Sequence, residues 1–114
     1  MKAVEGIEAL REQGILLRRV AKAVREVSPQ VRVILYGSRA RGDARPDSDY
    51  DLLVLTEDAG TLAVEEAIRT RLYPIELETD AVLTVMAHST ADWASPVFRA
   101  MPFHEHVERD GVLL

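Results

Sequence analysis

Two aspartates and a glycine–serine pair are the residues of this sequence whose types and spacing could perform chemistry. Asp49 and Asp51 flank one tyrosine at the start of an apolar run, and ten residues separate Ser38 from Asp49. Side chains two apart in a strand point to the same face, about 6.5–7 Å apart along the chain. Two carboxylates so placed repel each other unless a divalent cation lies between them, and hard oxygen ligands favour Mg²⁺. The pair therefore predicts a metal site at Asp49 and Asp51.

The Gly37-Ser38 pair lies where an apolar segment gives way to a polar one, which is typical of a strand that turns into a short helix. Backbone N–H groups at such a turn, together with a serine hydroxyl, can bind phosphate. Glycine lets the phosphate approach the backbone because no Cβ intervenes. Arg39 and Arg41 add positive charge beside the turn. We predict that Gly37, Ser38, Arg39 and Arg41 bind a nucleotide.

Each half of this pattern is common on its own, since Gly-Ser often forms an ordinary turn and Asp-x-Asp often begins a solvated strand. A phosphate site that leads into a paired-carboxylate metal site is typical of phosphoryl or nucleotidyl transfer with in-line displacement. The sequence contains no Gly-Lys-Ser/Thr loop, no Gly-x-Gly-x-x-Gly helix opening and no Gly-x-Ser-x-Gly elbow. These absences argue against P-loop NTPases, dinucleotide-binding domains and α/β-hydrolases.

Hydrophobic periodicity predicts the elements that would position these residues. We expect strands at residues 31–36, 50–56, 76–86 and 111–114, the second interior because it is apolar on both faces and the last a short edge strand. We expect helical structure at residues 2–27, 59–72 and 89–107, with a helical turn and a loop at 39–48. In the middle helix, Leu62, Ile68 and Leu72 lie on the inner side, and Pro74 marks its end.

Composition bounds the class of protein. The chain has 114 residues, which fits a single α+β domain over 1–114, and 47% of them are hydrophobic, enough for a core. There is no cysteine, which excludes disulfides and thiolate metal sites. The net charge of −5 argues against direct nucleic-acid binding. No apolar run approaches the ~20 residues of a membrane span, so we expect a cytoplasmic protein without a membrane partner.

The segment from Leu35 to Val54, with Gly37-Ser38, ten intervening residues and Asp49-x-Asp51, resembles the DNA polymerase β-like nucleotidyltransferase superfamily. It is most similar to the minimal nucleotidyltransferases (MNT proteins), and the ending Glu108-Arg109-Asp110-Gly111-Val112 is similar to theirs. The resemblance implies the polymerase β-like nucleotidyltransferase fold, a small mixed β-sheet flanked by helices. It also implies ATP as substrate and two Mg²⁺ ions.

The resemblance further implies a third carboxylate on a later strand, facing the first two. Asp80 lies in the predicted strand 76–86 and is preferred, with Glu78 as the alternative because it would share the same face. By analogy, Asp80 would join Asp49 and Asp51 in binding the metal and would draw the proton from the attacking hydroxyl.

The function that the resemblance implies is transfer of AMP from ATP to a hydroxyl acceptor. The chain lacks the helical domains that hold the acceptor in larger members, so a partner must supply it. In the MNT family the usual partner is a small helical HEPN toxin, and the protein would be an antitoxin that adenylylates a tyrosine of that toxin. Two alternatives stay open: a non-catalytic antitoxin that neutralises its partner by complex formation, and a nucleotidyltransferase for a small molecule.

Several other residues are assigned structural positions. His104-x-His106 lies in a predicted helix, where this spacing does not chelate a metal, so both are expected at the surface or an interface. Trp93 belongs to the core or to a partner-binding face, and His88 is expected in a loop. Ser48 is a turn residue that could position Asp49.

Overall fold

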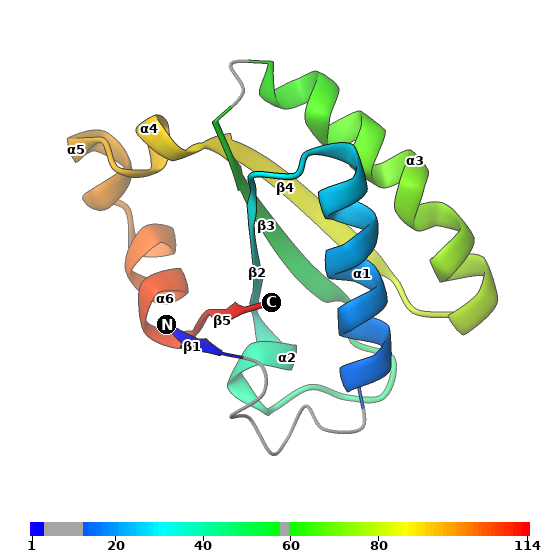
Figure 1. Ribbon diagram of the computed structural model, residues 1–114. Coiled ribbons are helices and arrows are strands. Elements are labelled where there is room, and N and C mark those ends of the chain that lie inside the picture. The colour runs from blue at the N-terminus through cyan, green and yellow to red at the C-terminus, as the bar shows by residue number, and fades with distance from the viewer. Residues whose placement is uncertain (4–12, 58–59) are drawn as a thin grey trace.

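The computed structural model describes residues 1–3, 13–57 and 60–114, and these form one mixed sheet flanked by helices (Figure 1). The strands are β1 (Lys2–Ala3), β2 (Arg32–Tyr36), β3 (Tyr50–Thr56), β4 (Leu83–Ser89) and β5 (Val112–Leu113). The helices are α1 (Gly14–Val27), α2 (Ser38–Arg41), α3 (Thr61–Thr79), α4 (Thr90–Trp93), α5 (Pro96–Arg99) and α6 (Pro102–Asp110). This mixed α+β architecture confirms the predicted fold class.

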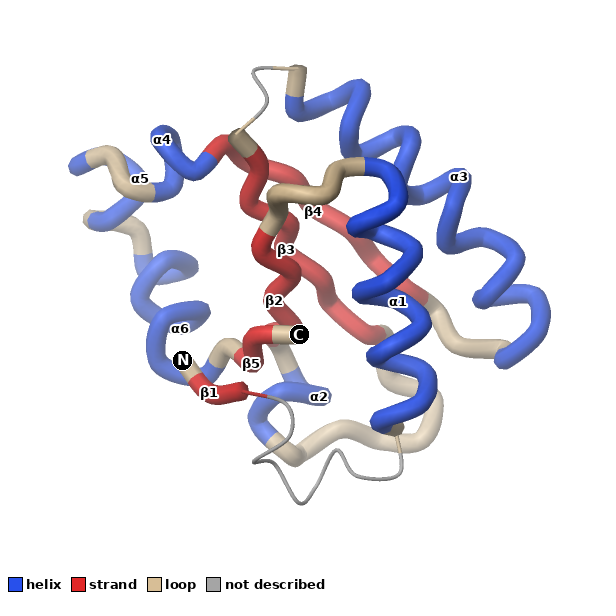
Figure 2. The backbone as a smooth tube through the Cα atoms, in the orientation of Figure 1, coloured by secondary structure: helices blue, strands red, loops and turns tan. Residues whose placement is uncertain are grey.

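The sheet has the strand order β1-β5-β2-β3-β4. Strand β2 is antiparallel to both of its neighbours, β3 and β5, whereas β3 and β4 run parallel. Figure 2 shows α1 and α3 on one side of the strands and α4, α5 and α6 on the other. The parallel β3–β4 pair needs a crossover connection, and α3 supplies it.

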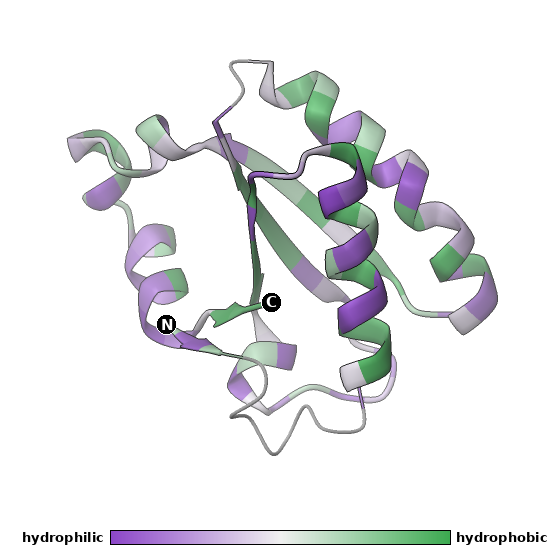
Figure 3. Cartoon of the chain, in the orientation of Figure 1, coloured by the Kyte–Doolittle hydropathy of each residue, from purple (hydrophilic) through white to green (hydrophobic). Residues whose placement is uncertain are grey.

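The core lies on both faces of the sheet. Leu52 and Val54 of β3 pack under α1 and α3, whereas Leu53 and Leu55 pack on the other face with Trp93. This explains the unbroken apolar run 52–55 within β3, which appears as a mainly green strand between two layers of helices of mixed hydropathy (Figure 3). The prediction of an interior strand at 50–56 is confirmed, with the same bounds.

The outer edge of β4 is covered by side chains of α3. The Leu83 N–H group donates to the carboxylate of Glu76 at 2.9 Å, and the guanidinium of Arg69 donates to the Val85 carbonyl at 3.1 Å. These contacts occupy backbone groups that would otherwise be available to another strand. They also fix the position of α3 along β4, and thereby the residue at which β4 begins.

Two predicted terminal elements differ from the structure. Lys2–Ala3 is a strand, not the start of a helix, and the remainder of the predicted first helix before Gln13 lies outside the described residues. Val112–Leu113 is not at an edge, because β5 pairs with β1 on one side and with β2 on the other. Both differences arise from pairing between the two ends of the chain, which local patterns do not encode.

The middle helix is longer than predicted. Helix α3 continues through Pro74 and ends at Thr79, so the start of the predicted third strand is helical. The apolar stripe of Ile68, Leu72 and Ile75 is buried on both sides of Pro74, and this packing outweighs the hydrogen bond that the proline removes. Leu62, which was expected on the inner side, is 67% exposed.

None of the helices among the described residues combines the length and the apolar composition that crossing a membrane requires.

Candidate active site

Asp49 and Asp51 lie at the beginning of β3, on either side of Tyr50. The Tyr50 side chain is 6% exposed and belongs to the core under α1 and α3, whereas Asp49 is exposed and Asp51 is half-buried. The Tyr50 N–H group donates to the Val82 carbonyl at 2.8 Å, which ties this end of β3 to the segment that enters β4. Because side chains alternate along a strand, burying Tyr50 turns both carboxylates away from that core.

The Asp51 carboxylate is held between residues of the two neighbouring strands. The Thr84 hydroxyl on β4 donates to Asp51 Oδ1 at 2.7 Å, and Asp51 is the register partner of both Thr84 and Tyr36. Burial raises the pKa of the Tyr36 hydroxyl, and the negative charge of Asp51 raises it further. Asp51 thus lies in a partly desolvated position where its charge affects its neighbours.

Gly37 brings the end of β2 against the same carboxylate. Its backbone has φ 77° and ψ −157°, and a Cβ placed there would collide with Asp51 Oδ2. Only glycine combines this backbone conformation with this approach. Sequence reasoning attributes the need for glycine at position 37 to access for phosphate. The structure gives a second reason, because the Asp51 carboxylate leaves no room for a side chain there.

The arginines of α2 have different surroundings. The Arg39 guanidinium donates to the Ser48 carbonyl at 2.9 Å and to the Pro46 carbonyl at 3.1 Å, and it lies 4.3 Å from the centre of the Tyr50 ring. Arg39 therefore anchors the loop that leads into Asp49. Arg41 forms an exposed ion pair with Asp43 at 3.3 Å.

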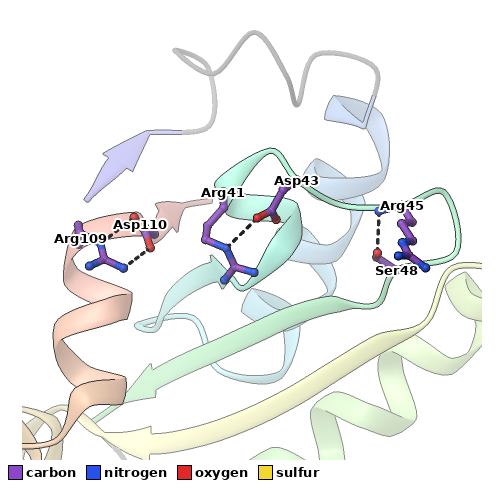
Figure 4. A network of polar contacts seen from close by, with 6 residues as sticks. All are labelled: Arg41, Asp43, Arg45, Ser48, Arg109 and Asp110. Atoms are coloured by element: carbon purple, nitrogen blue, oxygen red, sulfur yellow. Dashed lines mark hydrogen bonds and ion pairs between the residues drawn. The ribbon is translucent and has the colours of Figure 1, made fainter.

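The turn before Asp49 is closed by Ser48, as Figure 4 shows. Its hydroxyl accepts from the Arg45 N–H group at 2.8 Å, and its own N–H group donates to the Arg45 carbonyl at 3.0 Å. Ser48 is therefore a turn residue, as predicted, and its contacts set the direction in which the chain enters β3.

A cavity of about 230 Å³ adjoins the Gly37 turn and is bounded on its other side by α6. Its lining residues come from three elements: Tyr36, Gly37, Arg41, Phe103, His106, Val107 and Asp110. In Figure 4 the end of α6 lies beside Arg41. The hydrogen bond from Arg109 holds the pKa of Asp110 below its usual value, and the charges of Arg109, Arg41 and His106 lower it further. Sequence reasoning did not connect α6 with this site, because only the β2–β5 pairing brings it there.

The predicted third carboxylate is not in a strand. Asp80 caps the C-terminal end of α3 with φ 59° and is exposed, and Glu78 lies within α3 and pairs with Arg19 of α1 at 2.7 Å. Among the described residues, no group of three His, Cys, Asp or Glu side chains is placed to hold a metal ion. The prediction that Asp80 or Glu78 shares a strand face opposite Asp49 and Asp51 is therefore wrong. The reason is the extension of α3 through Pro74, which moves the strand to Leu83 and places Thr84 beside Asp51.

The remaining donor set still suits a hard divalent cation. Asp49 and Asp51 supply carboxylate oxygens from one short segment, and Gly37 places no side chain against Asp51 Oδ2. Mg²⁺ is usually bound by one or two carboxylates together with substrate phosphates and water. These two residues fit that requirement.

The other aromatic and imidazole side chains have structural roles. Trp93 is 3% exposed and lies in the core, the first of the two predicted alternatives, and it stacks on His104 with ring centres 4.4 Å apart. His106 lies on the same helix and lines the cavity described above. His88 is not in a loop but in β4, where its ring contacts Phe98 edge-on.

Comparison with protein families identifies the class of protein. A model described as "Nucleotidyltransferase domain" matches residues 17–91, well over half of the chain, and this protein belongs to that family. The match includes Gly37, Ser38 and both aspartates of the site. Comparison with curated protein sequences finds no match.

Solved structures show the same fold at low sequence identity. One described as a toxin–antitoxin with AMP-PNP is 20% identical with a TM-score of 0.59, over 84% of this chain and 69% of that chain. A putative nucleotidyltransferase from Sulfolobus solfataricus is 19% identical with a TM-score of 0.54, over 94% of this chain and 86% of that chain.

Proposed function

We propose that this protein is a metal-dependent nucleotidyltransferase that transfers AMP from ATP to a hydroxyl acceptor. The observation that carries the proposal is the placement of Asp49 and Asp51 next to the Gly37 turn, in a chain that belongs to the nucleotidyltransferase family. Paired carboxylates that bind metal beside a phosphate-binding turn can support in-line displacement at a phosphate.

The proposed roles in the site differ between the aspartates, the Gly37 turn and the two arginines of α2. Asp49 and Asp51 bind Mg²⁺, which when present neutralises charge on the phosphates. Gly37 and Ser38 hold the triphosphate, and Arg41, the last residue of α2, contributes positive charge. Arg39 supports the site by fixing the loop before Asp49 through its contacts with that loop, and it is not assigned to the phosphates. Asp80 is left out because it caps α3.

The acceptor is proposed to come from a partner protein. The fold likeness to a toxin–antitoxin structure with AMP-PNP supports an antitoxin that acts on its toxin. The acceptor would then be a tyrosine hydroxyl of a helical HEPN toxin, whose oxygen attacks the α-phosphorus of ATP. The bond from that phosphorus to the bridging oxygen breaks, pyrophosphate leaves, and the hydroxyl proton passes to solvent.

The direct test is transfer of label from ATP carrying ³²P in the α-phosphate to a helical HEPN protein, sought in the reading frame adjacent to this one, with Mg²⁺ present. We expect labelling by the wild type, loss of at least 100-fold in rate in Asp49→Asn and Asp51→Asn, and near-wild-type labelling by Asp80→Asn. The Asp80 variant is a matched control, because it makes the same chemical change at an exposed carboxylate whose left-handed backbone asparagine tolerates.

Three results would overturn this assignment: absence of label transfer by the wild type, full transfer by Asp49→Asn, or equal loss in Asp80→Asn. The alternative of neutralisation by complex formation has its own signature. In that case cells expressing the toxin would be protected equally well by the wild type and by a chain with both aspartates replaced.

A further inference from the structure

Thr84 is the residue that β4 places directly beside the Asp51 carboxylate. The parallel register pairs Asp51 with Thr84, and paired residues on neighbouring strands project to the same face. The Thr84 hydroxyl lies 2.7 Å from Asp51 Oδ1 and 3.4 Å from the Tyr50 carbonyl. A hydroxyl has one proton to donate, so the shorter contact, to the charged acceptor, is the stronger hydrogen bond.

The second carboxylate oxygen of Asp51 is constrained from the other side of β3. Oδ2 lies too close to Gly37 for a Cβ to fit between them, so the end of β2 limits how far the carboxylate can rotate. With Oδ1 bonded to Thr84 and Oδ2 against Gly37, one orientation of the Asp51 side chain is selected before any ligand binds. Groups that orient a metal ligand in this way typically change metal affinity by about 10–100-fold when removed.

The charge of the site follows from the same position. Asp49 and Asp51 together carry two negative charges, and the described residues contribute no third acidic or imidazole side chain to them. A hydroxyl at Thr84 adds no charge. One divalent cation balances the two carboxylates, whereas a second would depend almost entirely on the charge of the substrate.

We propose that Thr84 is a positioning residue that orients Asp51 for metal binding, and that its hydroxyl makes this a site for one divalent cation. This inference rests on the proposed function and deepens it, because the family resemblance implied two ions. Because the Thr84 hydroxyl is neutral, the chain without nucleotide would have weak affinity for the cation. The cation would therefore bind together with the nucleotide phosphates.

The test measures metal binding, not turnover. Mn²⁺ would be titrated into the full chain with and without α,β-methylene-ATP, a nucleotide that cannot transfer AMP, and free Mn²⁺ followed by electron paramagnetic resonance. The same nucleotide without protein gives the background. Three variants are informative: Thr84→Val removes the hydroxyl at nearly constant shape, Thr84→Ser keeps it, and Thr84→Asp adds a charge.

The wild type should bind one Mn²⁺ per chain–nucleotide complex and bind Mn²⁺ weakly without nucleotide. Thr84→Val should lower Mn²⁺ affinity by about tenfold, and Thr84→Ser should restore it to within about twofold. T84D should bind a second Mn²⁺ and should bind Mn²⁺ measurably without nucleotide. Because Thr84 is exposed and valine suits a strand, all variants should keep the wild-type melting temperature within a few degrees.

The inference is overturned if the wild type binds two Mn²⁺ ions, if Thr84→Val binds as tightly as the wild type, or if T84D gains no site. These outcomes leave the proposed transferase intact. Failure of the proposed function looks different, because a wild type that binds no Mn²⁺ even with nucleotide would remove the metal site itself and with it the role of Thr84.

Discussion

Replacing Gly37 with alanine tests the central geometric claim, that the end of β2 is built around the Asp51 carboxylate. The φ of 77° and ψ of −157° at Gly37 belong to a region that is essentially restricted to glycine. The added Cβ would also collide with Asp51 Oδ2 and displace it from the Thr84 hydroxyl. Gly37→Ala should therefore disturb both stability and the site.

The magnitude can be worked out from these two causes. The backbone conformation alone costs about 1–3 kcal/mol for a residue with a side chain. Displacing the Asp51 side chain and breaking its hydrogen bond adds about 1 kcal/mol at this partly exposed position. We expect the free energy of unfolding to fall by about 2–4 kcal/mol.

Gly42→Ala is the matched control. Gly42 also has a positive φ, of 84°, but no atom lies within 4 Å of the position that its Cβ would occupy. Its cost should be about 1–2 kcal/mol, from the left-handed backbone alone. Urea denaturation of the two alanine variants tests whether the substitution at Gly37 costs more than one at a positive-φ position whose Cβ would meet no atom.

A double-mutant cycle isolates the collision itself. With Asp51→Ala in place, the nearest remaining atom of that side chain is its Cβ, 3.5 Å from the added methyl group, which is an ordinary contact. Gly37→Ala should then cost about 1 kcal/mol less than it does in the wild type. Additive costs in this cycle, or a Gly37→Ala cost no larger than that of Gly42→Ala, would show that Asp51 does not restrict the side chain at position 37.

Three further predictions concern the fold around the site. Leu72→Ala should lower the free energy of unfolding by about 2–5 kcal/mol because Leu72 is fully buried. Leu62→Ala should lower it by less than about 0.5 kcal/mol because that side chain is exposed. Similar values for the two variants would contradict the observed orientation of α3. Arg39→Lys should lower the free energy of unfolding by about 1–2 kcal/mol and should speed hydrogen exchange in the loop before Asp49. The reason is that lysine lacks the planar guanidinium that donates to two carbonyls of this loop. Wild-type exchange rates in this variant would argue against an anchoring role for Arg39. Burial, and then the charge of Asp51, raise the folded-state pKa of Tyr36 above its unfolded value of about 10. The stability that this difference contributes is therefore fully present below about pH 10 and is lost as the pH rises through the folded-state pKa. The metal-free Tyr36→Phe variant should therefore lose less stability than the wild type above about pH 10, whereas Tyr73→Phe, at an exposed position, should follow the wild-type curve.

The parts of the fold that local sequence predicted well are the strands that flank the motif. β3 has the predicted bounds, residues 50–56, and β2 starts one residue later than expected. Ser95-Pro96 begins a helix because the serine side chain accepts from the Phe98 N–H group and the proline lies in the first turn. Each of these features depends on residues that are close in sequence, so periodicity and capping chemistry were sufficient.

The ends of α3 and β4 could not be read in the same way. Pro74 is a local signal to end a helix, but the buried stripe of Ile68, Leu72 and Ile75 makes continuation to Thr79 favourable. The prediction of Asp80 as a strand residue failed for this reason alone. Helix length here is decided by what the helix packs on, and that surface is assembled from distant segments.

Residue types and short spacing were enough to predict the mixed α+β class, the two main strands and the pairing of a glycine–serine turn with two aspartates. The residue that lies beside Asp51 depends on tertiary packing. The register between β3 and β4 places Thr84 there, and the length of α3 keeps Asp80 in its cap. Tertiary packing also decided that α6 borders the Gly37 turn and that Gly37 has no room for a side chain. These relations join elements distant in sequence, and only packing and strand register, neither of which has a local signature, bring them together.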